Sequence, residues 1–315
     1  MIEVLTIGEP MGLLVADEVK PLEEVEHFTR YVCGAEVNFS VGMARLGHEM
    51  AYVSKIGNDP FGKHIKKFLV ENKIDNRYVK FDEDHMTGMQ LKAKVVDGDP
   101  EVVNFRKNTA FANLTSADIE SIDWNGVKHL HITGIPAALS KSCRDAIYVL
   151  MDTAREHGVQ ISFDTNLRPA LWKDKAEMVR VINDLAFKAD IVLPGIAEGK
   201  ILTGSDDPET VADFYLKKGV KTAVIKVGSK GSFVKSKDEK FMAGAFHVEK
   251  VVDTVGAGDG FAVGVVSAIL EGKSLKEAAE RGAAIGAMAI MVEGDNEGLP
   301  TRDGLQKFLD QNKTN

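Results

Sequence analysis

Apolar and polar positions along the chain follow two different periods. Short runs rich in β-branched residues predict strands at 4–7, 51–55, 129–132, 160–163, 190–193 and 223–226. Between them, apolar residues at helical spacing predict helices near 36–46, 60–72, 140–157, 175–188 and 208–218. Strands that alternate with helices in this way are typical of βαβ units. The pattern therefore predicts an α/β fold with a mainly parallel central sheet and helices on both faces.

Two regions depart from this alternation. Residues 9–32 follow neither period and are predicted to be irregular. In residues 88–106, apolar and polar side chains alternate from Met89 onward, and a second short run follows at 102–105. This pattern predicts an antiparallel hairpin outside the parallel sheet. Such a hairpin can be a lid over a site, a surface for oligomerisation, or a solvated decoration.

The last third of the chain predicts a strand and two helices around a glycine-rich motif. The strand is predicted at 246–251, and the first helix ends near Leu270. The second helix is predicted at 274–292, where Ser274 and Glu277 have the spacing of a capping box.

Composition and charge exclude several classes of protein. The chain has 315 residues, of which 44% are hydrophobic and 27% charged, and a formal net charge of −8. That charge repels the backbone of nucleic acids, although a local basic pocket for a small anion remains possible. Two cysteines without a paired motif argue against a disulfide framework or a zinc site. The longest uncharged apolar runs, 260–270 and 282–292, are too short to span a bilayer, and no signal peptide is evident, so we expect a soluble cytoplasmic protein.

The glycine-rich motif is the first candidate for chemistry. Residues 253–261 read Asp-Thr-Val-Gly-Ala-Gly-Asp-Gly-Phe and precede an apolar helical stretch. Small residues at a helix start let unpaired N–H groups face one anion, which predicts a phosphate site. Asp259 is a candidate base for a hydroxyl that attacks the phosphate, although the helix N–H groups predict a low pKa for it. The alternative is a plain turn with an Asp N-cap, while a dinucleotide motif is disfavoured because Phe261 stands at its third glycine.

Three other stretches are candidates for binding. Gly34 allows close backbone approach and Asn38 offers a donor and an acceptor, which suits a polyhydroxylated molecule or a helix cap. Arg168 follows a predicted strand and Arg106 ends the hairpin, so both can meet an anion or be solvated. The glycines of 226–231 can pass close to a nucleotide or form a simple hairpin turn.

In their order along the chain, these motifs resemble those of the ribokinase-like (PfkB) sugar kinases. The matching motifs are Gly-Ala-x-x-Asn from Gly34, Asp-x-Asn-x-Arg from Asp164, Lys-x-Gly-x-x-Gly from Lys226 and Asp-Thr-x-Gly-Ala-Gly-Asp from Asp253. The resemblance covers essentially the whole chain. It implies a single three-layer αβα domain over 1–315, with a small β-sheet lid formed by about 9–32 and 86–108. It also implies transfer of phosphate from ATP to a sugar hydroxyl with Mg²⁺, with K⁺ as a further candidate cofactor. The alternating apolar residues of the hairpin favour a homo-oligomer formed through the lid, although a hairpin packed on its own core gives the same pattern.

The resemblance also implies roles for individual residues. Asp259 would be the catalytic base, and the anion hole would be formed by Gly256, Ala257 and Gly258. The sugar would contact Gly34, Asn38, Gln90, Arg106, Asn166, Arg168, Asp253 and Asp295. The nucleotide would lie against Lys226, Gly228, Ser229, Gly231, Gly256 and Gly258. Glu198 would act on the metal through water.

Within the family, the chain looks most similar to the 2-keto-3-deoxygluconate kinases. The similarity includes Phe105-Arg106-Lys107, the stretch from Phe163 to Trp172, and the stretch from Gly294 to Pro300. An acid sugar carries a carboxylate, and Arg106 and Arg168 are available to bind it. A fructokinase or another kinase of a neutral sugar is the alternative, although residues 9–13 contain no aspartate for sugar hydroxyls. A non-catalytic sugar-sensing protein is a third hypothesis, which the intact motif around Asp259 disfavours.

Three positions depart from the pattern of the family. Cys33 stands where a glycine usually precedes Gly34, so one backbone contact can differ. Gly195 replaces the asparagine of the usual Asn-x-x-Glu motif and leaves only Glu198, which puts the metal ligands in doubt. Gln90 stands where a tyrosine often faces the sugar, so the affinity for the ligand can differ.

Overall fold

A central sheet with helices on both faces forms the body of the molecule. The computed structural model describes residues 1–96, 98, 100–252, 254–292 and 294–312. Its central sheet has the order β13-β12-β11-β10-β9-β8-β1-β4-β5, which is parallel from β11 to β5 and antiparallel at the β11-β12-β13 edge. The strands are β1 (Val4–Ile7), β4 (Met50–Gly57), β5 (Asp75–Asp82), β8 (His129–Thr133), β9 (Gln160–Asp164), β10 (Ile191–Val192), β11 (Thr222–Lys226), β12 (Ser232–Ser236) and β13 (Lys240–Ala243). The prediction of a mainly parallel α/β sheet is confirmed.

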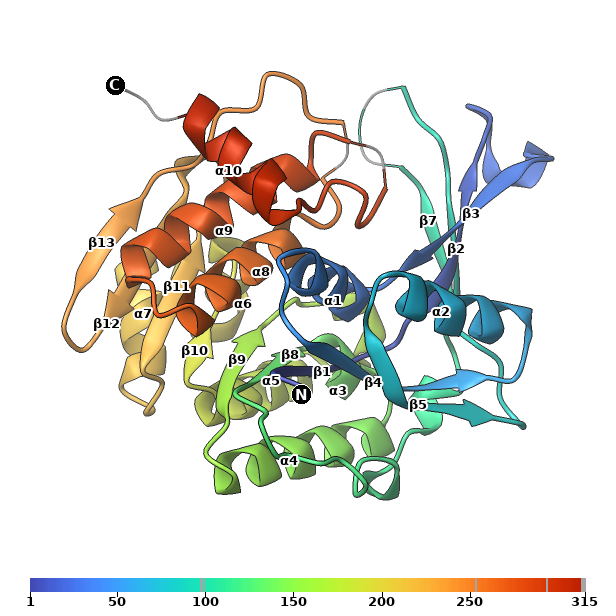
Figure 1. Cartoon of the computed structure of the whole chain (residues 1–315), viewed down its shortest axis with the longest axis horizontal. Helices are drawn as coiled ribbons and strands as arrows, with labels where there is room; N and C mark the ends of the chain where they lie inside the picture. The colour runs from blue at the N-terminus through green and yellow to red at the C-terminus, as the bar shows by residue number, and fades with distance from the viewer. Residues whose placement is uncertain (97, 99, 253, 293, 313–315) are drawn as a thin grey trace.

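The helices form two layers, each with its own hydrophobic core (Figure 1). One layer consists of α1 (Ala35–Arg45), α2 (Pro60–Glu71), α8 (Ala257–Leu270), α9 (Leu275–Ala289) and α10 (Arg302–Gln311). The other consists of α3 (Ile135–Leu139), α4 (Lys141–Glu156), α5 (Lys175–Lys188), α6 (Ile196–Thr203) and α7 (Pro208–Leu216). Short 3₁₀ turns lie at Leu22–Glu24, Phe111–Asn113, Ser116–Asp118, Pro169–Leu171 and Gly228–Lys230. Because successive strand residues face opposite sides, Val4 enters the first core and Leu5 the second.

A separate small sheet projects beside the central one (Figure 1). Its order is β3-β2-β6-β7, with β2 (Met11–Ala16), β3 (Phe28–Cys33), β6 (Met89–Lys92) and β7 (Val102–Phe105). The β6-β7 hairpin confirms the pattern of 88–106. The prediction that 9–32 is irregular is wrong, because β2 and β3 pair antiparallel along their whole length. β2 is an unbroken apolar run, so its period of two is not visible in the sequence.

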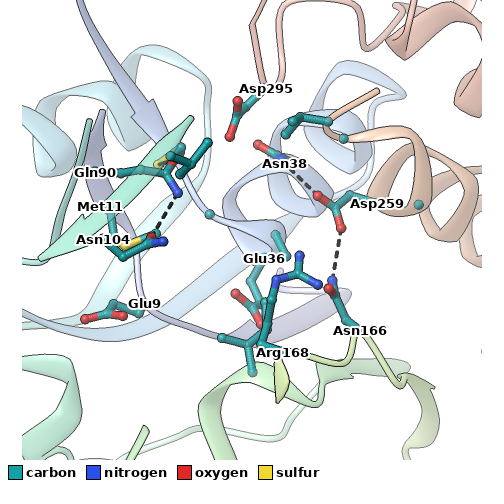
Figure 2. A pocket seen from close by; sticks show the side chains of 18 of the residues that line it. Glu9, Met11, Glu36, Asn38, Gln90, Asn104, Asn166, Arg168, Asp259 and Asp295 are labelled. Atoms are coloured by element: carbon teal, nitrogen blue, oxygen red, sulfur yellow. Dashed lines mark hydrogen bonds between the residues drawn. The ribbon is translucent and has the colours of Figure 1, made fainter. Parts of the chain in front are cut away.

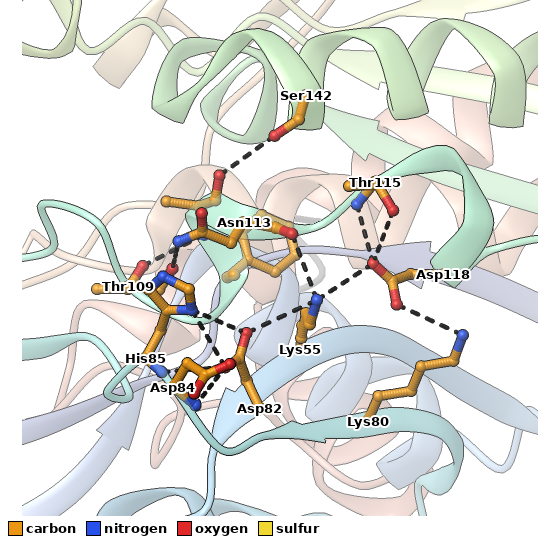
Figure 3. Close-up of polar contacts among 12 residues, drawn as sticks. Lys55, Lys80, Asp82, Asp84, His85, Thr109, Asn113, Thr115, Asp118 and Ser142 are labelled. Carbon is orange, nitrogen blue, oxygen red and sulfur yellow. Dashed lines mark hydrogen bonds and ion pairs between the residues drawn. The ribbon is translucent and has the colours of Figure 1, made fainter.

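The segments that enter and leave the hairpin are tied to the central sheet (Figure 3). Lys55 of β4 forms ion pairs with Asp82, 3.6 Å away, and with Asp118, 3.5 Å away. The Asp82 carboxylate also accepts from His85 at 3.1 Å. The N–H of Ala110 donates to the carbonyl of Met86 at 2.8 Å, so the two segments run side by side. The base of the small sheet is thereby anchored on both sides.

The predicted strand at 246–251 is wrong. Among the described residues, the antiparallel edge of the sheet ends with β13 at Ala243, and 246–251 pair with no strand. The ring of Phe246 packs against Phe308 of α10, with 5.3 Å between ring centroids. The apolar residue at the start of 246–251 is therefore explained by contact with a helix rather than by strand pairing. Other elements that were not predicted are β5, β12, β13, α3, α6 and α10.

α8 and α9 touch backbone to backbone. A Cβ added at Gly264 would lie 2.5 Å from the backbone of Gly282, so only glycine permits this distance. The predicted capping box of α9 is confirmed, since Ser274 and Glu277 bond each other's backbone N–H groups. No helix within the described ranges is both long and apolar enough to cross a bilayer.

Candidate active site

A polar cavity of about 540 Å³ opens at the carboxyl ends of the parallel strands. This is the edge where open α/β sheets bind ligands. The cavity lies between the central sheet, the N-terminal ends of α1 and α8, and the small sheet (Figures 1 and 2). Its lining includes Glu9, Gly34, Glu36, Asn38, Gln90, Asn104, Arg106, Asp164, Asn166, Arg168, Glu198, Lys226, Gly256, Gly258, Asp259 and Asp295. The structure therefore brings together the predicted sugar-binding residues that it describes, while Asp253 lies outside the described residues.

The start of α8 has the geometry of an anion site. Gly256 caps the helix with φ 80°, and a Cβ there would lie 2.5 Å from the carbonyl oxygen of Asp295. Glycine is thus required both for the left-handed backbone and for the close approach. The first N–H groups of a helix have no partner inside it, and Ala257 and Gly258 begin this one. The ammonium of Lys226 lies near Gly258 and adds positive charge.

Asp259 is held by two asparagines (Figure 2). Asn38 donates from Nδ2 to one carboxylate oxygen at 2.8 Å, and Asn166 donates to the other at 3.4 Å. Burial raises the pKa of Asp259, against the hydrogen bond from Asn38 and the charges of Arg168 and Lys226, which lower it. The prediction of a low pKa is therefore wrong, because removal from water outweighs these lowering interactions. A raised pKa brings the carboxyl closer to the range in which a general base works.

Lys226 forms a buried ion pair below the anion site. Its ammonium lies 2.7 Å from Asp164, whose side chain is 2% exposed. Burial raises the pKa of Asp164 to about 6, although the charge of Lys226 acts to lower it. Burial lowers the pKa of Lys226, but the carboxylates of Asp164, Glu198 and Asp259 raise it more. Lys226 therefore stays charged at neutral pH.

Glu198 fixes the loop that carries Asn166 and Arg168. Its carboxylate accepts from the N–H groups of Gly195 at 2.7 Å and Leu167 at 2.6 Å, and from the hydroxyl of Thr165 at 2.7 Å. In the part of the chain that is described, no three His, Cys, Asp or Glu side chains group into a metal cage. Mg²⁺ usually keeps several waters and binds phosphates together with one or two carboxylates. The residues present thus fit an ion that arrives with a nucleotide and meets Glu198 through water.

The two predicted arginines differ in their surroundings. One carboxylate oxygen of Glu9 accepts from Nε of Arg106 at 2.8 Å and lies 2.6 Å from its Nη2. The other oxygen of Glu9 accepts from the hydroxyl of Thr109. Glu9 is 2% exposed, so this is a buried pair. Arg168 is exposed at the cavity and donates to the neighbouring carbonyl of Leu167 at 3.0 Å. Arg168 is therefore better placed than Arg106 to bind a further anion.

The small sheet contributes a pair of amides to the cavity. Gln90 and Asn104 stand opposite each other in the β6-β7 register, and Gln90 donates to Asn104 at 3.0 Å (Figure 2). Cys33 donates to the oxygen of Gln90 at 3.6 Å. Asn104 was not predicted, although its position opposite Gln90 in the hairpin is a signal that could have found it.

Glu36 is a second residue that the sequence does not reveal. It lies in the first turn of α1, is 1% exposed, and accepts from the hydroxyl of Thr133. A Cβ at Gly8 would lie 2.2 Å from its carboxylate, so the backbone of Gly8 closes over it. Burial raises the pKa of Glu36 to about 7. A glutamate in a first helical turn looks like a solvated residue in the sequence, and nothing there signals its burial.

A second cavity, of about 360 Å³, adjoins the first. The two share Lys226, Thr254 and Gly258. The lining of the second also includes Gly228, Ser229, Gly231, Ala245, Phe246, Ala257, Phe261, Ala283, Gly286, Ala287 and Ile290. Of the residues predicted to lie against a nucleotide, this mainly apolar slot beside the anion site is lined by Lys226, Gly228, Ser229, Gly231 and Gly258, whereas Gly256 lines the first cavity.

Comparison with known proteins gives four consistent matches. The family profile described as pfkB family carbohydrate kinase matches residues 1–302. The 2-dehydro-3-deoxygluconokinase of Bacillus subtilis (strain 168) is 47% identical over 315 residues, which cover 99% of this chain and 97% of that relative. The crystal structure of a PfkB protein from Polaromonas sp. JS666 has a TM-score of 0.89 at 42% identity and covers 97% of this chain and 99% of that one. A putative ribokinase II from E. coli in complex with ATP and Mg²⁺ has a TM-score of 0.91 at 26% identity and covers 99% and 100%.

Proposed function

The chain belongs to the pfkB family of carbohydrate kinases, and we propose that its substrate is 2-keto-3-deoxygluconate. The product would be the 6-phosphate ester, 2-keto-3-deoxy-6-phosphogluconate. The observation that carries the proposal is the exposed guanidinium of Arg168 in the same cavity as Asp259. An acid sugar has a carboxylate at one end and a primary hydroxyl at the other. The name of the Bacillus subtilis relative supports the same substrate.

Binding of the sugar is proposed to use both walls of the cavity. The carboxylate of the sugar lies against Arg168, because a planar guanidinium can donate two parallel hydrogen bonds to it. Arg106 is proposed to contribute through hydrogen bonds rather than through its charge, since Glu9 neutralises that charge. Gln90 and Asn104 offer amide groups to the middle of the sugar, and Gly34 and Asp295 line the cavity nearby.

The reaction is proposed to rest on position and electrostatics. As the terminal hydroxyl oxygen bonds to the γ-phosphorus, the bond from phosphorus to the bridging oxygen of ADP breaks, and the hydroxyl proton passes to Asp259. The N–H groups at the start of α8 and the ammonium of Lys226 stabilise the negative charge on the oxygens of the transferred phosphoryl group. Asn38 and Asn166 keep the carboxylate of Asp259 in place.

ATP is proposed to occupy the second cavity, with its phosphates toward α8. The apolar slot between Phe246 and the small residues of α9 suits a purine ring. Mg²⁺ bound with the nucleotide would neutralise phosphate charge, with Glu198 as its water-mediated partner. K⁺ belongs to the proposal through the family resemblance, and rates in K⁺ and in tetramethylammonium buffers test it.

The remaining proposals concern the small sheet and the setting. Residues 9–32 and 86–108 are proposed to act as a lid that excludes water from the cavity. The same sheet is proposed to form the contact between copies of the chain, which sedimentation of a lid variant tests. Cys33 and Cys143 are both unpaired, which suits the reducing cytoplasm.

A coupled assay across sugar acids and neutral sugars tests the substrate. We expect turnover with 2-keto-3-deoxygluconate, and expect Arg168→Met to raise its KM by 10- to 100-fold while a neutral sugar is hardly affected. Arg180→Met, on the exposed surface of α5, is the matched control. Turnover with fructose or ribose but none with the keto acid would refute the substrate.

A further inference from the structure

Residues 294–299, which follow α9, touch α1 at both ends of that helix. Near the end of α1, Arg45 donates from Nη1 to the carbonyls of Asn296 and Leu299, each at 2.7 Å. Near its start, Asn296 donates from Nδ2 to the Oδ1 of Asn38 at 3.4 Å. The same Nδ2 donates to the carbonyl of Val32 at 3.0 Å. One side chain thus joins the C-terminal segment, the small sheet and the asparagine that holds Asp259.

The side chain of Asn296 is fixed by its own surroundings. It is 2% exposed. Its N–H donates to the carboxylate of Glu297 at 3.1 Å, and its carbonyl accepts from the N–H of Leu299 at 3.3 Å. Gly298 presses against α9, since a Cβ there would lie 2.8 Å from the carbonyl oxygen of Met288. The segment therefore holds Asn296 in one position.

α1 stands directly against the helix that carries Asp259. Asn38, Gly42 and Arg45 are spaced four and three residues apart, so they lie on one face of α1. A Cβ at Gly42 would lie 2.6 Å from Val263 of α8. This contact holds α1 against α8 one turn after Asn38. The amide group of Asn38 can still turn about its last bond.

We propose that Asn296 is a positioning residue that keeps the amide of Asn38 turned with its N–H groups toward Asp259. A backbone carbonyl can only accept, so Val32 fixes which end of the Asn296 amide points at it. That orientation makes Asn296 a donor to Asn38, and Oδ1 of Asn38 therefore faces Asn296. Its Nδ2 then faces the carboxylate of Asp259, which can only accept while it is ionised. A turned amide would place an oxygen against that carboxylate instead.

The inference rests on Asp259 as the base of the proposed reaction. The pH dependence of kcat then reports the pKa of Asp259. The hydrogen bond from Asn38 lowers the pKa of Asp259. Arg168, Lys226, Asp164 and Glu36 are charged or titratable groups among the described residues that interact with this carboxyl, and a change at position 296 replaces none of them. Loss of the orientation therefore moves the acidic limb of the pH profile to higher pH.

The test combines Asn296→Leu with Asn38→Ala. We expect Asn296→Leu to lower kcat by about 10- to 30-fold, to change KM for sugar and ATP by less than threefold, and to move the acidic limb upward by about half a pH unit or more. Because Asn296 acts through Asn38, we expect it to change kcat by less than twofold in the Asn38→Ala background. The proposal would be overturned if Asn296→Leu left the acidic limb in place. It would also be overturned if the loss of kcat in the double variant equalled the product of the losses in the two single variants.

A matched control separates this role from a general loss of stability. Asn183 is also buried, and it donates to the carbonyl of Leu202 at 2.9 Å and accepts from Tyr215 at 3.3 Å. It is not among the residues that line the cavity. Asn183→Leu is expected to lower the Tm and leave the acidic limb in place; a limb that moved as far as in Asn296→Leu would overturn the proposal.

Two further variants keep the outcome clear. If Asn296→Leu does not fold, Asn296→Ser makes the same prediction for the acidic limb, and an unmoved limb there overturns it. Asp259→Asn tests the underlying reaction separately. A near-normal rate in Asp259→Asn refutes the assignment of Asp259 as the base. If Asp259→Asn loses most of its activity but Asn296→Leu leaves the acidic limb in place, only the role of Asn296 is refuted.

Discussion

The two cavities that meet at Lys226 and Gly258 are built in opposite ways. The first is walled by carboxylates, amides and arginines that come from distant parts of the chain and hold one another. The second is walled mainly by small and apolar residues, many of them from α8 and α9. In the first, Glu9, Asn38 and Asp164 are buried and bonded to a partner side chain, so a single change there leaves a buried group without its partner. In the second, a change mainly alters the space. Substitutions in the first cavity therefore test the phosphate transfer, and substitutions in the second test the binding of the nucleotide.

The strongest test of the polar cavity is Asp259→Asn. The amide keeps the size of the side chain but cannot take a proton, so we expect kcat to fall by about 10³-fold, roughly 4 kcal/mol. ATP affinity, measured by calorimetry, should change by less than threefold because the second cavity is untouched. A parallel loss of ATP binding would mean that the two cavities are not separable.

The next effect is on stability, at the pair of Arg106 and Glu9. Arg106→Met leaves the carboxylate of Glu9 buried without its cation, so we expect the free energy of unfolding to fall by roughly 3–5 kcal/mol. Denaturant unfolding followed by tryptophan fluorescence measures it. Glu9→Gln in the same chain should recover most of the loss. Arg168→Met is the matched control, and it should cost less than about 1 kcal/mol because Arg168 is exposed. Equal losses in the two variants would contradict the difference between the arginines.

The third test uses the pKa of Glu36, which burial raises to about 7 from an ordinary value of 4.5. The native state then binds the proton more tightly than the unfolded state, so the contribution of Glu36 to stability is fully present below pH 4.5 and is lost as the pH rises to 7. Glu36→Gln stays neutral and should gain roughly 3 kcal/mol relative to the parent between pH 4.5 and pH 8. Unfolding of both proteins across this range measures the difference, and parallel curves would refute the raised pKa.

The smallest effect is expected in the apolar cavity. Ala283→Leu adds volume on the α9 wall, so KM for ATP should rise about tenfold, or roughly 1.4 kcal/mol, while KM for the sugar and kcat at saturating ATP change little. Ala283→Ser, which is nearly the same size, serves as the control. A rise in KM for the sugar of similar size would place the nucleotide elsewhere.

The sequence predicts the regular parts of the fold well, and its misses have physical reasons. The strand predicted at 4–7 and the helix predicted at 175–188 agree with the structure in both bounds. β5 was missed because its charged residues hide the alternation that buries Tyr78. The wrong strand at 246–251 shows that an apolar period of two is also produced by contact with a helix, as at Phe246.

For the site, the sequence predicts which residues gather but not which of them bond to each other. Asn38 was interpreted as a sugar contact, yet its partner in the structure is Asp259, 221 positions away. Arg106 was paired with Arg168 as a cation for the substrate, and Glu9 could not be recognised as its partner because residues 9–32 were predicted to be irregular. Such pairings depend on distances between separate elements, which motif spacing does not contain.

The backbone contact between Gly264 and Gly282 has a consequence for how the enzyme changes over evolution. Because α8 and α9 meet through backbone at this point, a larger residue at Gly264 would push the two helices apart and with them displace the anion site at the start of α8. Adaptation to a new sugar is therefore confined to parts that can exchange side chains freely, chiefly β6, β7 and the loop around Arg168. In a library selected for a different acceptor, substitutions should accumulate in those segments, while the two glycines persist unchanged in every lineage that still transfers phosphate.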